Sequence, residues 1–358
     1  MKNFRRSLKT TVANALHRLS LDTLIGHSIG TANTPLIICY HRVVQDFDEA
    51  ATRAMPSLLV STSMFEKQLD WLLRHFDLVS LDEILQNQKI NSRKTRRQAT
   101  ITFDDGYADF YWNALPILQR KGIPSSVFVV TNLVGTTRLQ THDELYLLLS
   151  HWYMHPVRCE NNSEKSLEVQ LMTALDLHSD SFAAARYLLE VFSQDQVSNM
   201  LSLLRTHVDV PSQSLKEFAS LDWPMLRDMV EKDVTIGSHT LSHALLPHHD
   251  QQRVADELLG SRLKLEAELG VPAGFLAYPD GQFNNRIARE AEAAGYAGAL
   301  TICTHTSSQH PRHTMPRTVL WENACIDSNG EFSSAIMGCL VNGVFNLSSS
   351  CTQDHTVS

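Results

Sequence analysis

The sequence predicts an α/β protein built on a parallel β-sheet, either open or closed into a barrel. Short apolar segments typical of buried strands alternate with amphipathic segments of helical periodicity along most of the chain. Helices between strands are the connections that parallel strands need. Acids and histidines also follow several strand segments directly. Because functional residues of such folds collect at the carboxyl ends of the strands, this clustering indicates an enzyme.

The expected elements follow one another in a regular order. A buried strand at 35–40 comes first, and the capping sequences Ser63-Met64-Phe65-Glu66 and Ser80-Leu81-Asp82-Glu83 then start two helices. Further strands are expected at 99–103, 126–130, 234–237, 275–278 and 299–302, and further helices at 109–121, 222–232, 250–269 and 284–294. Residues of about 135–220 have helical periodicity without strand signals, which predicts a helical insertion.

We therefore divide the chain into three parts. An N-terminal helical part occupies residues 1–30, and the main domain occupies 31–325 with the insertion inside it. Residues 326–358 are expected to form a C-terminal tail, because the last of them are polar.

Composition excludes several function classes. The 358 residues are 43% apolar, which is enough for a full core, and the formal net charge of −8 argues against nucleic-acid binding through phosphate neutralisation. No run of about 18 apolar residues predicts a transmembrane helix. The six cysteines contain no CxxC pair, and this usage fits a reducing compartment.

The first residues predict a basic amphipathic helix. Apolar residues recur at helical spacing, with the basic residues mostly on the other face: Phe4, Leu8, Val12, Leu16 and Leu19, against Lys2, Arg5, Arg6 and Lys9. Polar residues interrupt this segment, unlike the core of a secretory signal peptide. One interpretation is peripheral membrane contact through residues 1–25, and the other is a helix docked on the protein's own body. We expect a cytoplasmic protein, associated with the inner membrane face under the first interpretation.

Asp104 and Asp105 form the most informative feature of the sequence. They follow the apolar strand segment 100–103 and precede Gly106. Adjacent carboxylates repel each other, but a metal ion can neutralise one and leave the other free to act as a base. The simpler interpretation is a solvated Asp-Asp-Gly turn, because these residues are common turn formers.

His239 and His243 form a second candidate pair. His239 directly follows a strand segment, and on a helical turn the two imidazoles lie on one face. Together with Asp105 they suit a catalytic zinc or another divalent transition metal. The same ligand types occur in non-haem iron oxygenases. Those enzymes usually have an all-β scaffold, which the alternation of strands and helices contradicts.

With these features assembled, the sequence resembles the polysaccharide deacetylases with a NodB-homology domain, carbohydrate esterase family 4. The run from Thr102 to Tyr107 is similar to the first family motif, and Ser238-His239 to His243 is similar to the second. Residues 277–281, Ala-Tyr-Pro-Asp-Gly, resemble the third motif. The similarity spans about residues 35–320, interrupted by the insertion. It implies a distorted (β/α) barrel of about seven strands.

The resemblance also implies roles for individual residues. Asp104 is expected as the general base, while Asp105, His239 and His243 are expected to hold a divalent metal ion, most commonly zinc, with iron, cobalt or nickel as alternatives. Tyr40-His41 resembles a motif in a branch of the family with a permuted strand order, which makes His41 the expected general acid. The expected substrate-binding residues are Tyr107, Tyr278, Pro279 and Asp280.

One position departs from the family pattern. The third motif often carries an arginine two residues before its proline, where it orients the base, but this chain has Ala277 there. We therefore expect another group, such as Arg42, to orient Asp104, or a weaker orientation.

The expected reaction removes N-acetyl groups from amino sugars of a polysaccharide or oligosaccharide, with a metal-bound water as nucleophile. An N-acetylated glycan is then the expected partner. One alternative is a small-molecule amidohydrolase on the same scaffold, similar to allantoinase. The other is a non-catalytic carbohydrate-binding relative, which the missing arginine at position 277 favours.

Overall fold

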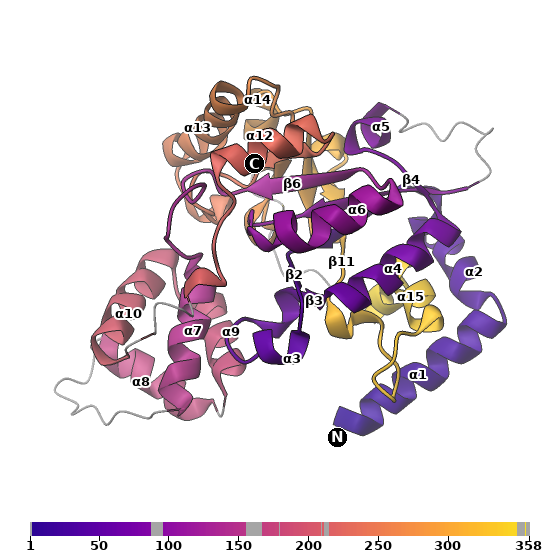
Figure 1. Ribbon diagram of the computed structural model, residues 1–358, viewed down its shortest axis with the longest axis horizontal. Coiled ribbons are helices and arrows are strands. Elements are labelled where there is room, and N and C mark those ends of the chain that lie inside the picture. The colour runs from indigo at the N-terminus through magenta and orange to yellow at the C-terminus, as the bar shows by residue number, and fades with distance from the viewer. Residues whose placement is uncertain are drawn as a thin grey trace.

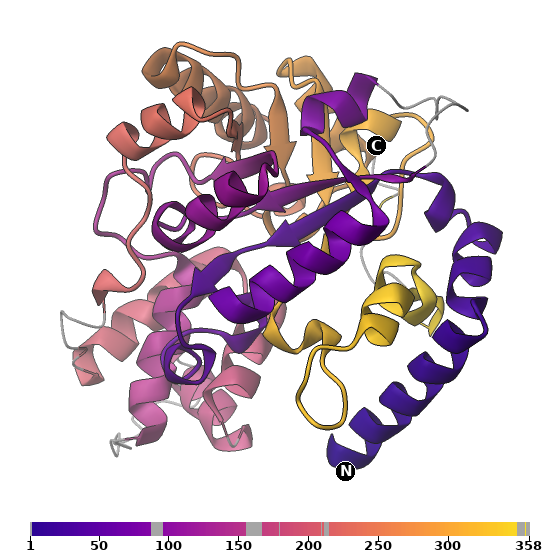
Figure 2. The same cartoon turned by 45° about the vertical axis from the view of Figure 1, so that its right-hand side comes forward.

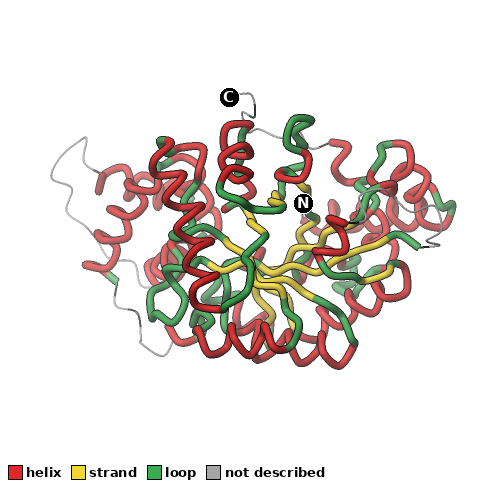
Figure 3. Tube along the Cα trace, turned by 90° about the horizontal axis from the view of Figure 1, so that it is seen from above, coloured by secondary structure: helices red, strands yellow, loops and turns green. Residues whose placement is uncertain are grey.

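The protein is described by a computed structural model that places residues 2–86, 96–154, 167–178, 180–208, 210, 215–348 and 355. Sequence predictions for 155–166 and for most of 349–358 lie outside these ranges. Parallel strands gather in the middle of the molecule and helices surround them (Figure 3). This arrangement confirms the predicted α/β class.

The central sheet has the strand order β10-β9-β8-β7-β6-β5-β1-β11, and all its described pairs are parallel. Its strands are β1 (Leu36–Tyr40), β5 (Gln98–Phe103), β6 (Ser125–Val129), β7 (Thr235–Ser238), β8 (Phe275–Ala277), β9 (Gly298–Thr301), β10 (Met315–Pro316) and β11 (Thr318–Val319). The short β4 (Asp77–Leu78) pairs with β5, and β2 (Arg42–Val44) pairs with β3 (Leu59–Ser61) in a separate small sheet.

Residues 315–319 close this sheet into a barrel. Met315 pairs with Leu300 of β9, whereas Val319 pairs with Cys39 of β1 at the opposite end of the strand order. Because β10 and β11 are consecutive pieces of one segment, with only Arg317 between them, the described strands make a ring of about seven. The predicted distorted barrel is therefore confirmed.

The helices outside the barrel begin and end close to the predicted positions (Figure 1). They are α4 (Thr62–His75), α5 (Leu81–Gln86), α6 (Leu115–Lys121), α12 (Trp223–Glu231), α13 (Gln251–Leu269) and α14 (Asn285–Ala293), with α3 (Phe47–Ala50) as a single turn between β2 and β3. Asp222, Asp250 and Asn284 cap their helices through side-chain oxygens. One cap differs from the prediction, because Ser61 and not Ser63 accepts the bond from Met64 N that starts α4.

The described residues between 141 and 207 are largely helical. They form α7 (Thr141–Met154), α8 (Leu167–Leu177), α9 (Ser181–Val191) and α10 (Gln194–His207), which stand beside the barrel at the lower left of Figure 1. A cluster of buried apolar side chains joins these helices, including Leu149, Leu171, Leu188 and Leu204. The insertion therefore has its own small core.

The N-terminal helices pack against a helix of the C-terminal region (Figure 2). Helix α1 (Lys2–Arg18), followed by α2 (Leu21–Ser28), lies against α15 (Ser334–Val341), where Ala13, Ile336 and Cys339 are buried. One face of the N-terminal helix is therefore docked on the protein's own body. Several apolar side chains of this segment remain exposed: Leu8, Val12, Leu19, Leu24 and Ile29. The prediction of a tail is wrong for residues 334–341, because α15 contributes to a core.

No described helix is both long enough and apolar enough to cross a membrane.

Candidate active site

Asp104 and Asp105 lie buried at the carboxyl end of β5. Their residues are only 3% and 4% exposed, so the interpretation as a solvated turn is wrong. Asp105 adopts a left-handed conformation with φ of 72°, and Gly106 follows at 71°. This bend ends the strand alternation and lets both acids line one cleft. A side chain at Gly106 is excluded because its Cβ would lie 2.9 Å from Val129.

Asp105, His239 and His243 meet as the sequence predicts. The Nε2 atoms of both histidines lie 3.5 Å from Asp105 Oδ1, and one ligand atom from each of the three residues falls within 4.8 Å of the others. Nδ1 of His239 is 2.8 Å from the carbonyl oxygen of Ala277 and donates its hydrogen to it. Nε2 is then unprotonated, and its lone pair is free to bind a metal ion. These are the geometry and donor types of a divalent metal site with three protein ligands.

The two histidines lie on a turn and not on the predicted helix. Thr240 and His243 both adopt left-handed conformations, with φ of 66° and 58°. Helix α13 stabilises the turn, because its buried Glu257 accepts hydrogen bonds from the backbone N–H and the hydroxyl of Ser242. The four-residue spacing brings the imidazoles together, with ring centroids 4.8 Å apart, by a different backbone path.

Arg317 is the partner of Asp104 that the sequence left unassigned. Its Nη1 and Nη2 donate to Asp104 Oδ1 and Oδ2 at 2.7 and 2.5 Å, and its side chain is fully buried. Arg42 is not the partner, because its guanidinium pairs with Asp109 at 2.8 Å and donates to the carbonyl of Glu217. Arg317 stands at the junction of β10 and β11, so the segment that closes the barrel also delivers the arginine.

The two neighbouring acids have opposite protonation behaviour. Burial raises the pKa of Asp104, but the guanidinium of Arg317 outweighs burial and holds this pKa well below its usual range. Burial raises the pKa of Asp105 to about 7, and the nearby Asp104 carboxylate adds to the effect. Burial also lowers the pKa values of His239 and His243, to about 3 and about 4. Both histidines are thus neutral at neutral pH, as metal ligands must be.

His41 lies across the cleft from these ligands, just beyond β1. Its Nδ1 is buried without a hydrogen-bond partner in the described residues, and burial lowers the pKa of the imidazole to about 4. Cys39, His41 and Asp104 form a second group with metal-ligand spacing. That group suits an ion poorly, because Arg317 occupies both oxygens of Asp104 and burial raises the pKa of the Cys39 thiol.

The helical insertion contributes two residues that the sequence reasoning missed. His142, at the start of α7, places Nε2 at 3.8 Å from Asp105 Oδ2, and Gln140 Nε2 donates to Asp105 Oδ1 at 3.4 Å. The pKa of His142 is raised because Asp143 and Asp105 together outweigh its burial. The sequence offered no signal beyond polar residues at a helix start.

The expected substrate-binding residues separate into two groups. Asp280 is exposed and lines the cleft, at a left-handed position next to Gly281. Tyr107, Tyr278 and Pro279 are buried, and none of them lines the cleft. The hydroxyl of Tyr107 donates to Asp143 Oδ2 at 2.6 Å, and that of Tyr278 donates to the carbonyl of His313 at 2.8 Å. The prediction that Tyr107 and Tyr278 contact the substrate is therefore wrong for this cleft.

The cleft itself has a volume of about 260 Å³. Asp104, Asp105, His41, His239 and His243 line it, together with Asp280 and Ile302. His142 and Leu189 of the insertion, with Met55 and Leu58 after α3, also line it. The insertion thus helps to shape the space in which a substrate would lie.

The fold is shared with solved deacetylase structures. A Streptococcus pyogenes deacetylase, PplD, in complex with acetate is 16% identical, with a TM-score of 0.52 over 83% of this chain and 95% of that one. IcaB from Ammonifex degensii is also 16% identical, with a TM-score of 0.51 over 86% of this chain and 97% of that one.

Sequence comparison gives a more specific result. A poly-beta-1,6-N-acetyl-D-glucosamine N-deacetylase of Staphylococcus aureus is 30% identical over 158 residues, which are 38% of this chain and 54% of that protein. The relative of the same name in Staphylococcus epidermidis is 30% identical over 113 residues, 29% of this chain and 39% of that protein. The matches thus span about half the length of the curated relatives or less. The family model for polysaccharide deacetylase matches residues 91–299, more than half of the chain, and the chain therefore belongs to the polysaccharide deacetylase family.

Proposed function

We propose that this protein is a metal-dependent hydrolase that removes N-acetyl groups from the amino sugars of a glycan. The observation that carries the proposal is the division of labour between two adjacent acids. Asp104 is held by Arg317, whereas Asp105 faces two neutral imidazoles. Family membership and the curated relatives named for poly-β-1,6-N-acetylglucosamine support this class of substrate.

The residues of the site fit a divalent metal ion, most commonly zinc, held by Asp105, His239 and His243. When bound, such an ion supplies Lewis-acid chemistry: it polarises the acetyl carbonyl and lowers the pKa of a water molecule. Iron, cobalt or nickel would suit the same nitrogen and oxygen donors.

The side chains around the ligands perform the proton transfers in this proposal. Asp104 accepts a proton from the attacking water, and Arg317 holds its carboxylate ionised and in one orientation. His41 gives a proton to the departing amine nitrogen. Because the pKa of His41 is about 4, the imidazole is neutral at neutral pH. The proton that Asp104 takes from the water passes to His41 during the reaction, since ligand atoms of Asp104 and His41 lie within 4.8 Å of each other.

The missing arginine at position 277 no longer favours a non-catalytic relative. Arg317 occupies the space next to Asp104 and makes the bidentate contact that this role requires. The cleft of about 260 Å³ would accommodate roughly one sugar ring with its acetyl group, which agrees with attack on one residue of a glycan at a time.

Acetate release from β-1,6-linked N-acetylglucosamine oligomers, with zinc, cobalt or nickel added to metal-stripped protein, tests the proposal. We expect Asp104→Asn to lower turnover by about 10²–10⁴-fold, the usual contribution of a general base, and to keep the bound metal. Asp70→Asn on the exposed face of α4 is the matched control and should retain full turnover.

Near-normal turnover in Asp104→Asn would rule out the assigned base. Hydrolysis of allantoin without acetate release from any acetylated glycan would instead favour a small-molecule amidohydrolase.

A further inference from the structure

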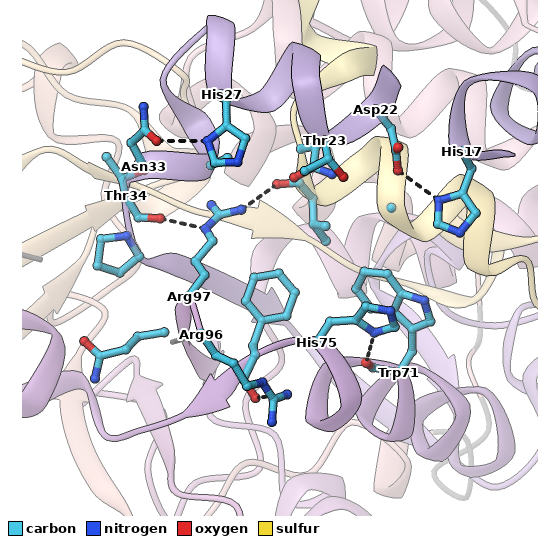
Figure 4. A pocket seen from close by; sticks show the side chains of 17 residues that line it. His17, Asp22, Thr23, His27, Asn33, Thr34, Trp71, His75, Arg96 and Arg97 are labelled. Carbon is cyan, nitrogen blue, oxygen red and sulfur yellow. Dashed lines mark hydrogen bonds and ion pairs between the residues drawn. The ribbon is translucent and has the colours of Figure 1, made fainter. Parts of the chain in front are cut away.

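A second cavity, of about 500 Å³, lies at the opposite end of the barrel from the candidate active site. It opens where β1 and β5 begin, between α2, α4 and the end of α15. Gln98 at its edge starts β5, and Asp104 follows the end of the same strand. A six-residue strand is about 20 Å long, so the two sites are separate. Figure 4 shows the cavity with Arg97 in its centre.

Arg97 contacts backbone carbonyls and the ring of Phe76, and it has no acidic partner among the described residues. Its Nε donates to the carbonyl of Thr34 at 2.7 Å and its Nη1 to the carbonyl of Val341 at 3.3 Å, and no described carboxylate lies within 4 Å of it. Desolvation lowers the pKa of this guanidinium to about 10, so it is still charged at neutral pH. A partly desolvated cation without a counter-ion is costly unless a ligand supplies the anion.

The rest of the cavity wall is also more cationic than acidic. Arg96 lies at the exposed edge, where its Nε is 3.7 Å from Asp77 Oδ1, and Asp22 is the one carboxylate among the lining residues that the structure describes. One oxygen of Asp22 lies 3.0 Å from His17 Nδ1, and the other is buried without a hydrogen-bond partner in the described residues. The protein as a whole carries a formal net charge of −8, so a cationic cavity runs against its overall charge.

Two lining side chains hold hydrogen-bond donors without acceptors. The Nε1–H of Trp71 and the Nε2–H groups of Gln98 are buried and have no partner in the described residues, and both side chains are more than nine-tenths buried. Unsatisfied buried donors are rare in native structures. These two atoms have almost no accessible surface, so a ligand in the cavity would meet the guanidinium of Arg97, whose Nη2 has no hydrogen-bond acceptor among the described residues. A guanidinium binds a phosphate through paired, charge-assisted hydrogen bonds.

An apolar wall adjoins these donors. Trp71 and Phe76 lie on one side of the cavity, with Pro35, Ala32 and Val341 nearby. His75 stacks on Trp71 with ring centroids 4.0 Å apart, which fixes the indole in place. Such a wall would contact the carbon part of a ligand.

We propose that this cavity binds an organic phosphate, with phosphate oxygens on Arg97 and the carbon part against Trp71 and Phe76. Two sources present this chemistry: a soluble phosphate ester and the headgroup of a membrane phospholipid. The exposed Leu24 and Ile29 lie on and next to α2, which forms one wall of the cavity, and would face the apolar part of a lipid.

Binding of dihexanoylphosphatidic acid below its micellar concentration, measured by calorimetry on the full chain, tests the cavity. We expect saturable binding that Arg97→Gln weakens about tenfold or more, the usual effect of losing charge-assisted hydrogen bonds. Inorganic phosphate should bind more weakly, because it lacks a carbon part. Equal affinity of the parent chain and Arg97→Gln, equal affinity for inorganic phosphate, or no saturable binding would overturn the proposal.

Three further variants keep the test decisive where Arg97→Gln does not fold. Thr23 is exposed at the cavity edge and has no hydrogen bond assigned to its side chain, so Thr23→Glu adds a carboxylate there without breaking a contact. We expect Thr23→Glu to weaken binding several-fold at low salt and Thr23→Gln, of the same size, to leave it unchanged. Ala32→Trp should block the cavity. Identical binding in all three variants would contradict the site, and acetate release should be unaffected in each.

Sedimentation with phosphatidylcholine vesicles, with and without phosphatidic acid, distinguishes the two sources. Sedimentation that needs phosphatidic acid and is lost in Thr23→Glu but not in Thr23→Gln supports a lipid. Binding of the soluble probe without sedimentation supports a soluble ester. Sedimentation that stays at the level of the parent chain in both Thr23→Glu and Ala32→Trp, with no saturable binding of the soluble probe, overturns the cavity as the site.

Discussion

The two ends of the barrel each place an arginine beside strand β5, but only one of the two has a carboxylate partner among the residues that the structure describes. At the carboxyl end, Arg317 makes two hydrogen bonds to Asp104, and both groups are buried. At the amino end, Arg97 donates to two carbonyl oxygens and lies over the ring of Phe76. An arginine whose carboxylate partner belongs to the protein holds that carboxylate in place. An arginine without such a partner can instead bind an anion from outside the protein.

Removing Arg317 should have the largest effect in this comparison. Arg317→Gln leaves the Asp104 carboxylate buried without its partner, and we expect the free energy of unfolding at neutral pH to fall by about 3–5 kcal/mol, measured by urea denaturation. Arg317→Lys keeps the charge and should recover part of this loss. A loss below about 1 kcal/mol for Arg317→Gln would mean that Asp104 is not ionised in the folded protein.

The same variant has a pH signature. In the parent chain the pKa of Asp104 lies below its unfolded value, so the stability it contributes is present above about pH 4 and is lost as the pH falls. Without Arg317, burial should raise that pKa above the unfolded value, and stability should fall as the pH rises through it. The acidic limb of the pH–turnover profile should also move to higher pH. An unchanged limb would show that Asp104 is not the base.

The metal affinity of the site at the carboxyl end of the barrel should depend strongly on pH. The pKa of Asp105 is about 7 without metal, while those of His239 and His243 are about 3 and 4. Between pH 7 and pH 5 only Asp105 must lose a proton to bind metal, so affinity should fall about tenfold per pH unit. Competition with a chromophoric chelator measures this. A flat profile over that range would mean that Asp105 is already ionised.

A smaller effect is expected from His142, which lies next to Asp105 at the carboxyl end of the barrel. His142→Gln removes an imidazole 3.8 Å from Asp105 Oδ2, and we expect zinc affinity to fall about tenfold, the lower range for partners of metal ligands. His151→Gln, on the same helix α7, is the control and should not change affinity. Equal affinity of the His142 variant and the parent chain would make His142 a substrate contact or a spectator.

The smallest expected effect on stability is at the amino end of the barrel, where Arg97 lies. Arg97→Gln loses two hydrogen bonds to carbonyl oxygens but also removes an unpaired charge, so the free energy of unfolding should change by about 1 kcal/mol or less. The same urea titration measures it. A loss as large as that for Arg317→Gln would break the contrast and assign Arg97 a purely structural role.

Much of the fold was predictable because its signals are local. Asp222, Asp250 and Asn284 cap helices where the sequence predicts helix starts, and the barrel strands lie within a residue or two of the predicted apolar runs. The short β10 and β11 were not predicted. Two-residue strands carry no periodicity, and their pairing depends on partners about 15 and 280 residues away in the sequence.

The candidate site divides in the same way. The sequence by itself predicted Asp104, Asp105 and His239 as site residues from their places at strand ends, and His243 from its spacing to His239. Only the tertiary structure decided that Arg317 pairs with Asp104, that His142 of the insertion lies next to Asp105, and that Tyr107 and Tyr278 are buried. The physical reason is that burial and charge pairing arise between segments far apart in the chain, and barrel closure sets which of them meet.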